Sequence, residues 1–222
     1  MHVVLVSSPG PGTEVHWSHA VAGELATRLR ARGDGVRWLA MVRPGQRLAS
    51  PATIVSPTFV VMPALRALPR VAAESQLLAV ENVLTRALRE VGPAVVVHVG
   101  IGARGSPNVP WLAERMGATA FAFARAAEVV CHRGDLVDRD HRACIDFLDP
   151  ARCRRCCAAW CRRPHVIDFQ NRSDLLAASL QACRMVFVPT AADIDRLAAF
   201  GVSPRALVVT ADPESIVAQV SP

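Results

Sequence analysis

The chain has 222 residues, of which 51% are hydrophobic and 20% are charged. This composition excludes a disordered protein, and the length suits one large domain or one domain with an insert. The net charge of +6 invites a nucleic-acid function, but all 25 basic residues are arginine and only 5% of residues are aromatic. Because no aromatic residues interleave with a basic stripe, we expect no nucleic-acid partner.

The amino terminus, MHVVLVSSPGPG, is too short and too uncharged for a signal peptide, and it predicts a buried strand. The longest apolar runs fall well short of a membrane span. We therefore expect a cytoplasmic protein whose thiols stay reduced. The odd number of cysteines, seven, agrees with that expectation. Clustered cysteines in such a compartment more often bind metal or do redox work than form disulfides.

Strand-like and helix-like segments alternate along the chain. Short β-branched runs predict buried strands, and apolar residues at helical spacing predict the helices between them. Thr190 and Asp193 form a capping-box pattern before one helix, and Ser106 is a candidate cap of another. The expected strands are 2–7, 36–42, 58–62, 94–100, 118–124, 185–189 and 205–212, and the expected helices are 15–32, 71–91, 106–117, 169–184 and 191–200.

Repeated strand–helix–strand units imply parallel strands with right-handed crossovers and helices on both faces. We predict one α/β domain over residues 1–222, a doubly wound Rossmann-like parallel sheet of about seven strands. Periodicity fails from about Glu128 to Pro164, which predicts a cysteine-rich insert at 128–165 within the domain. The insert and the loops at 8–14 and 100–108 follow strands directly, so they should share the edge where ligands bind.

Six of the seven cysteines lie between residues 131 and 161. Cys131, Cys144, Cys153 and Cys156 make the metal pattern C-x12-C-x8-C-x2-C, in which the C-x2-C pair places two sulfurs on one tight turn. Four sulfur ligands without an open water position favour structural zinc as the cofactor. The neighbouring arginines would lower the thiol pKa values and partly offset the charge of a four-thiolate centre.

Other ligands and occupants remain open at this stage. Cys157 or Cys161 could replace one of the four ligands, and so could His132, His141 or His165. The cysteines could instead be unliganded small hydrophobes, form disulfides or hold an iron–sulfur cluster. A catalytic thiol is not expected, because no histidine partner pattern is readable around it.

Histidines and glycines near the same edge are weaker candidates. His16 and His19 lie on the cleft side of the first predicted helix, where a general base for an acceptor hydroxyl would be needed, although helix histidines are more often solvated or capping. His98 lies within a core strand and is expected to be a satisfied core histidine. The run GIGARG (100–105) departs from the dinucleotide fingerprint, so it favours a tight turn over a phosphate cradle and argues against a nucleotide-binding oxidoreductase.

Four segments carry a family resemblance: ELATRLRARGDGVRWL (24–39), VVVHVGIGARGSPNVPWLAERMG (95–117), CHRGDLVDRDHRACIDFLDPARCRRC (131–156) and MVFVPTAADIDRLAAFGVSPRALVV (185–209). In this order they resemble the N-terminal, acceptor-side domain of family 4 (group 1) GT-B glycosyltransferases. The resemblance covers essentially the whole chain. This chain departs from the family's pattern just before the first cysteine. Family members often have a His-Asp pair there, whereas this sequence has Arg125-Ala126.

In GT-B enzymes a second Rossmann-like domain binds the nucleotide-sugar, and this chain ends at Pro222, about where that domain would begin. The resemblance therefore implies an acceptor-side domain that is not catalytic alone and acts with a donor-binding domain on a partner chain. If it is an enzyme, it would be a hexosyl-type glycosyltransferase with a sugar or glycan acceptor, and no residue is assigned as catalytic. The alternative is a degenerate glycosyltransferase domain reused as a zinc-stabilised protein-binding or regulatory module.

Overall fold

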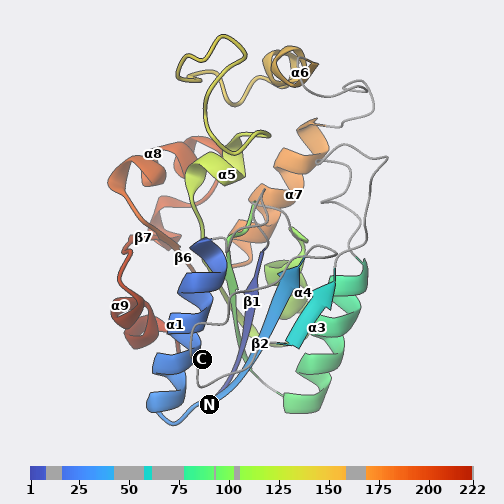
Figure 1. Cartoon of the computed structure of the whole chain (residues 1–222), viewed down its shortest axis with the longest axis vertical. Helices are drawn as coiled ribbons and strands as arrows, with labels where there is room; N and C mark the ends of the chain where they lie inside the picture. Colours follow the sequence, from blue (N-terminus) through green and yellow to red (C-terminus); the bar gives the residue numbers. More distant parts are fainter. Residues whose placement is uncertain are drawn as a thin grey trace.

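The computed structural model describes residues 1–8, 17–42, 58–61, 78–92, 94–102, 106–158 and 169–221. Within these residues one sheet has the strand order β3-β2-β1-β4-β5-β6-β7, and every pairing is parallel (Figure 1). The strands are β1 (His2–Ser7), β2 (Gly35–Val42), β3 (Thr58–Val61), β4 (Val95–Val99), β5 (Thr119–Phe123), β6 (Met185–Val188) and β7 (Leu207–Val209).

Helices connect these strands and cover both faces of the sheet. A short 3-10 turn at Pro204–Ala206 leads into β7. The helices are α1 (Trp17–Ala31), α3 (Leu78–Val91), α4 (Val109–Arg115), α5 (Ala126–Val130), α6 (Pro150–Ala158), α7 (Phe169–Gln181), α8 (Ala191–Ala199) and α9 (Pro213–Gln219).

The strand order reverses at the pairing of β1 with β4. The chain first builds outward from β1 to β2 and β3, and then returns to place β4 on the other side of β1. Loops that leave β1 and β4 therefore diverge, and in sheets of this kind the crevice between them is the usual ligand-binding position. The register pairs Val6 with His98 and Ser7 with Val99, so the polar ends of the two strands lie side by side.

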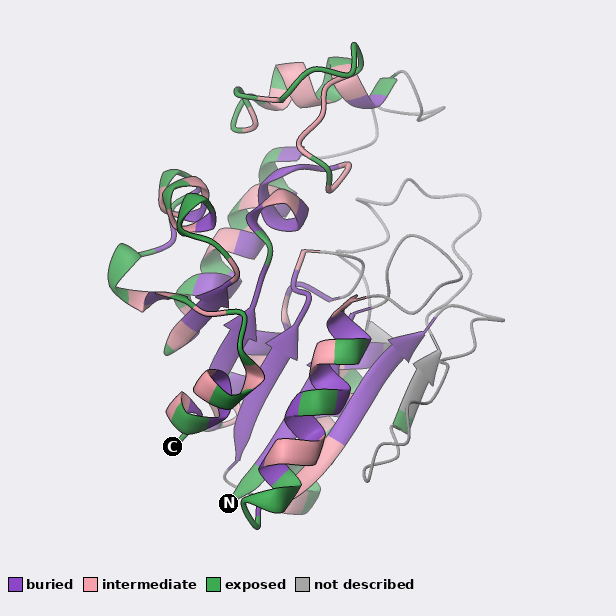
Figure 2. Ribbon diagram, turned by 60° about the vertical axis from the view of Figure 1, so that its left-hand side comes forward, coloured by how far each residue is buried: buried purple, intermediate pink, exposed green. Residues whose placement is uncertain are grey.

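Two apolar layers form the core, one on each face of the sheet (Figure 2). Successive strand residues point to opposite faces, so Val4 and Val6 belong to one layer while Val3 and Leu5 belong to the other. The first layer packs against α3, α4, α5, α7 and α8, and the second packs against α1 and α9. Because both faces are covered, the strands read as nearly continuous apolar runs.

The predicted α/β Rossmann-like class with a parallel sheet is confirmed. Thr190 is confirmed as the N-cap of α8, because Asp193 N–H donates to its side chain at 3.3 Å, while the Asp193 carboxylate accepts from the Thr190 hydroxyl at 2.7 Å and from the Ala126 N–H at 3.1 Å. The proposed cap at Ser106 is wrong, since the N-cap of α4 is Asn108 and the Ser106 hydroxyl donates to Glu81 Oε1 at 2.9 Å instead.

Three described helices are not in the predicted set. α5 follows β5, α6 lies in the segment where periodicity fails, and α9 follows β7, where the prediction extended a strand to residue 212. α9 begins with Asp212 as N-cap, whose carboxylate accepts from the backbone N–H groups of Glu214 and Ser215. Its start could have been read from the sequence Asp-Pro-Glu-Ser, since proline is favoured in the first helical turn.

A search of the described residues for helices that could cross a membrane finds none with the necessary length and apolar character.

Candidate functional site

Buried serines and histidines meet at the carboxyl edge of β1 and β4. Ser7 Oγ lies 2.8 Å from His19 Nδ1 and accepts a hydrogen bond from Trp38 Nε1 at 2.9 Å. Ser8 Oγ lies 3.0 Å from His98 Nε2. All five residues are at most 3% exposed, so each polar atom needs a protein partner. The two histidines, brought from α1 and β4, are thus bound to adjacent serines at the end of β1.

His98 is neutral in this setting. Its burial lowers its pKa to about 3, because a charged imidazole would lose its hydration there. The sequence-based expectation of a satisfied core histidine holds for Nε2, whereas Nδ1 has no hydrogen-bond partner among the described residues. A neutral imidazole can accept or donate a hydrogen bond, but it cannot supply a proton at neutral pH.

His19 departs from the solvated or capping role that is commoner for helix histidines. It lies on the first helix as predicted, but it is only 2% exposed and contacts Ser7 rather than solvent. His16, the other candidate of that helix, lies outside the described residues.

The loop that follows β4 passes very close to neighbouring backbone. Gly102 has a φ of +89°, and a Cβ added to it would lie 2.8 Å from the carbonyl oxygen of Glu128. Arg172 of α7 links this loop to α5. Its guanidinium donates to the carbonyls of Val129, Gly102 and Glu128 at 2.8, 3.1 and 3.1 Å. Arg172 is 4% exposed, so these charged hydrogen bonds are shielded from water.

An aromatic and charged cluster lies beside this loop. The Trp17 ring packs edge-on against Phe123 at 5.5 Å between centroids, and its Nε1 donates to Glu128 Oε1 at 2.7 Å. The Arg125 guanidinium lies 4.4 Å from the centre of the same ring. Arg125 is exposed at the end of β5, so an accessible positive charge stands at the edge where ligands bind in sheets of this type.

The first part of the cysteine segment is a small hairpin, which lies with α6 beyond α5 and α7 (Figure 1). Val137 and Ala143 form an antiparallel bridge, and Cys144 N–H donates to the Leu136 carbonyl at 2.7 Å. Leu136 and His141 have positive φ angles of 54° and 61°, which turn the chain back on itself. The hairpin thus brings Cys144 back toward Cys131, although twelve residues separate them in the sequence.

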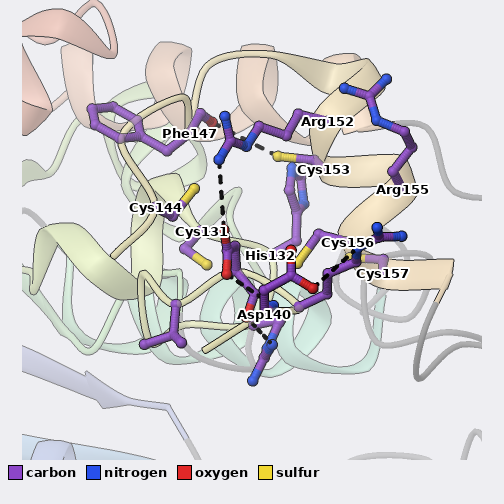
Figure 3. Close-up of a pocket in the computed structure, with 14 residues that line it drawn as sticks. Cys131, His132, Asp140, Cys144, Phe147, Arg152, Cys153, Arg155, Cys156 and Cys157 are labelled. Carbon is purple, nitrogen blue, oxygen red and sulfur yellow. Dashed lines mark hydrogen bonds and ion pairs between the residues drawn. The ribbon is translucent and has the colours of Figure 1, made fainter. Parts of the chain in front are cut away.

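α6 supplies the other cysteines of the lobe, by which we mean residues 131–158. Asp149 lies before the helix, and its carboxylate accepts from the Ala151 N–H at 2.8 Å. Cys153 and Cys156 are three residues apart, so they share one helix face. Figure 3 shows their sulfurs on the side of α6 that faces Cys131 and Cys144. A cavity of about 250 Å³ between α6 and the hairpin is lined by all four cysteines.

The four predicted metal ligands therefore line one cavity, but they do not form a closed site. No group of three or more His, Cys, Asp or Glu side chains within the described ranges is arranged to hold a metal ion. The six described cysteines are all free thiols. Of the alternative ligands, His141 is exposed in the hairpin and Cys157 is buried against Phe169, while Cys161 and His165 lie outside the described residues.

The thiols interact electrostatically across the cavity. The pKa of Cys153 is raised to about 12, first by burial and then by the neighbouring Cys131, Cys144 and Cys156. Burial is also the main cause that raises the pKa of Cys144, with Cys131 next. Thiols with a raised pKa are poor nucleophiles. Ionisation of several of them together requires a nearby cation that offsets the repulsion between the thiolates.

Several residues of the carboxyl edge carried no signal in the sequence. Ser7 and Ser8 looked like the end of a strand and the start of a loop, and Trp17 and Arg172 looked like ordinary helix residues. Their roles depend on partners far away in the chain, such as Glu128, which is 111 positions beyond Trp17 in the sequence.

The fold has neighbours among solved structures. UDP-N-acetylglucosamine 2-epimerase from Rickettsia bellii superposes with a TM-score of 0.51 at 10% identity, over 98% of this chain and 46% of that one. A co-structure of S. aureus MnaA with UDP gives 0.50 at 12% identity, over 96% and 44%. This chain thus spans less than half the length of those structures. No protein-family model and no curated protein sequence matches it.

At these identities the likeness establishes the fold alone. The neighbours have the GT-B fold, so the chain is a Rossmann-like, GT-B-type domain. The resemblance to GT-B enzymes is therefore confirmed as a statement about fold. The likeness does not point to family 4 within that fold.

Proposed function

We propose that the chain is the acceptor-side domain of a family 4-like GT-B glycosyltransferase, and that a donor-binding domain on a partner chain completes its active site. The observation that carries the proposal is that the domain superposes on 98% of its own length but only 46% of a GT-B neighbour. In the GT-B architecture the two domains face each other across their carboxyl edges. The carboxyl edge of the sheet, with the exposed Arg125, would then face a sugar acceptor.

The chemistry of that edge suits hydroxyl-rich ligands. Arg125 offers an exposed cation beside Trp17, while the buried pair of Ser8 and the neutral His98 supports the strand ends behind it without adding charge. Aromatic rings, hydroxyls and one charge are the mixture by which concave sites orient polar ligands. A carboxylate or phosphate on the acceptor would pair with Arg125. We also propose a cytoplasmic location, in keeping with the free thiols of the six described cysteines.

The test is a titration of the purified chain with two ligand classes, followed by backbone amide NMR. Mono- and disaccharides, with and without an acidic group, are expected to shift the resonances of Ser8, Gly100 and Arg125. UDP- and GDP-sugars are expected to be neither bound tightly nor hydrolysed, because the donor site would belong to the other domain. The control variant Arg205→Ala removes an exposed arginine near β7 and should leave the titration unchanged.

Two outcomes contradict the proposal. Turnover of a nucleotide-sugar by the isolated chain would show that it needs no separate donor domain. Saccharide titrations that shift no resonance at the carboxyl edge would show that this edge does not bind acceptors.

A second candidate function is that of a protein-binding or regulatory module built on a degenerate glycosyltransferase domain. Ile145 and Leu148, next to Cys144, are 77% and 50% exposed, and large apolar side chains on a surface often mark protein contacts. Tight association with a non-enzymatic protein, lost in Ile145→Asp and combined with no response to saccharides, would favour this alternative.

A further inference from the structure

We propose that the lobe binds one zinc ion through Cys131, Cys144, Cys153 and Cys156, and that the ion clamps the hairpin onto α6. This inference does not depend on the proposed function, since it concerns how residues 131–158 acquire a fixed shape. Four thiolates supplied by two separate structural elements are the ligand set of a closed, structural zinc site.

The backbone already places the ligands in pairs. The hairpin hydrogen bonds from Gly134 N–H to the Cys131 carbonyl (3.0 Å) and from Cys144 N–H to the Leu136 carbonyl (2.7 Å) bring the first pair to one side of the cavity. On the other side, α6 carries Cys153 and Cys156 on one face. Figure 3 shows the cavity between these pairs.

Two further candidate ligands, Cys157 and His132, also line the cavity but pack against Phe169 of α7. Cys157 follows Cys156 directly and is only 1% exposed. The His132 ring packs edge-on against the same phenylalanine, at 4.4 Å between ring centres. Both residues therefore take part in the small apolar cluster that attaches the lobe to α7.

Positive charge is available to balance the site. Four thiolates around Zn²⁺ leave a net charge of −2, which the surroundings must offset. The Arg133 guanidinium lies within hydrogen-bonding reach of the Cys156 sulfur and pairs with Asp135 at 3.0 Å. Arg152 and Arg155 line the same cavity, and Arg152 reaches Asp138 of the hairpin at 3.6 Å.

Zinc binding would have to bring the cysteine sulfurs of the hairpin side and those of α6 closer together. The described thiols do not form a metal-binding group as they stand, and a zinc site needs each sulfur about 2.3 Å from the ion. In the structure Cys131 instead contacts the Asp135 carboxylate (3.8 Å) and Cys153 the Phe147 carbonyl (3.9 Å). Both contacts are long, and coordination of a zinc ion by these two sulfurs would replace them.

The lobe buries few apolar side chains. Leu136 and Phe147 are half-buried against the main core and Cys157 belongs to the small cluster at Phe169, whereas Ile145 and Leu148 are exposed. Segments that cannot bury a core of their own commonly depend on a metal, because metal binding then supplies part of the folding free energy.

The experiment measures metal content and metal spectra on the full chain, purified without chelator or metal-affinity tag. We expect one zinc per chain by elemental analysis. Replacing zinc with Co²⁺ should give the visible bands of a tetrahedral thiolate centre. Chelation of the zinc should expose four additional reactive thiols of the seven cysteines.

Matched variants assign the ligands. Cys144→Ser and Cys153→Ser should lower the affinity for zinc by more than the roughly 10–100-fold that loss of an outer-shell partner causes. Cys157→Ser, within the lobe, and Cys183→Ser, in the main core, should each retain one zinc. If a ligand variant folds poorly, the Co²⁺ titration of the wild-type chain still decides whether a four-thiolate site exists.

Three results overturn the proposal. The first is a chain free of metal, with no thiolate spectrum on Co²⁺ addition. The second is iron together with inorganic sulfide, which would make the site an iron–sulfur cluster. The third is a disulfide between any two of the four cysteines in protein purified under reducing conditions.

Discussion

The close approach of Gly102 to α5 can be tested with one added methyl group. A Cβ at this position would lie 2.8 Å from the Glu128 carbonyl oxygen and 2.8 Å from the Val129 Cα. Both are backbone atoms, which cannot swing away as a flexible side chain could. Gly33 has a similar φ of +94°, but no described atom lies within 4 Å of an added Cβ there, so it provides a matched control.

The two substitutions differ by a single energetic term. Alanine at a positive φ destabilises by about 1–2 kcal/mol, and this applies to both Gly102→Ala and Gly33→Ala. Only Gly102→Ala also forces atoms into an occupied space, which costs about 1–3 kcal/mol. Replacing glycine with alanine also lowers the conformational entropy of the unfolded chain. This stabilising effect is the same for both variants, so it cancels when they are compared. We therefore expect Gly102→Ala to be the less stable variant by about 1–3 kcal/mol, the size of the packing cost alone.

Thermal and urea unfolding of the wild type and both variants measures this difference. For a chain of this size each kcal/mol lowers Tm by roughly 2–4 °C. NMR should also show amide shifts around Glu128 and Val129 in Gly102→Ala and not in Gly33→Ala. Equal Tm values for the two variants would refute the close packing of the β4 loop on α5.

Three further predictions concern buried groups. Because the pKa of His98 is about 3 in the fold and near 6.5 when unfolded, stability should decline by up to about 1.4 kcal/mol per pH unit as the pH falls from 6.5 toward 3. Urea unfolding should show this slope reduced in His98→Gln, and an unchanged slope would contradict the burial of His98. Arg172→Met removes the donor to three buried carbonyls and should cost about 3–5 kcal/mol, whereas Arg205→Met at an exposed site should change stability by less than about 0.5 kcal/mol. Similar losses in both variants would count against a special role of Arg172. Leu84→Ala leaves a cavity at a fully buried position of α3 and should lower the free energy of unfolding by about 2–5 kcal/mol. A smaller decrease would show that the core at α3 is loosely packed.

The sequence predicted the positions of the strands better than the ends of the helices. β1 and β2 lie within about one residue of their predicted bounds, because a strand buried on both faces leaves a continuous apolar run. The helix predicted at 106–117 occupies only Val109–Arg115, since the Ser106 hydroxyl donates to Glu81 and Asn108 is the N-cap. A side chain's choice between a local cap and a distant partner depends on the packed structure.

α6 illustrates why part of the site could not be predicted. Apolar periodicity arises only where one face of a helix is buried along its length. α6 has a single fully buried residue, Cys157, so its sequence contains no such pattern. The cysteine spacing nevertheless selected four of the five cysteines that line the cavity, because the C-x2-C pair sits on one helical turn.

The sequence by itself determined the α/β class, the alternation of strands and helices, the Thr190 cap and the grouping of cysteines, because all of these depend on the local geometry of the backbone. Only the tertiary structure decided that Ser8 meets His98, ninety residues away, and that Arg172 binds three carbonyls at the base of the lobe. It also decided that Cys157, which lines the cavity beside Cys156, is buried against Phe169. Such contacts depend on the order in which strands enter the sheet and on how helices pack across it, and no short stretch of sequence specifies either.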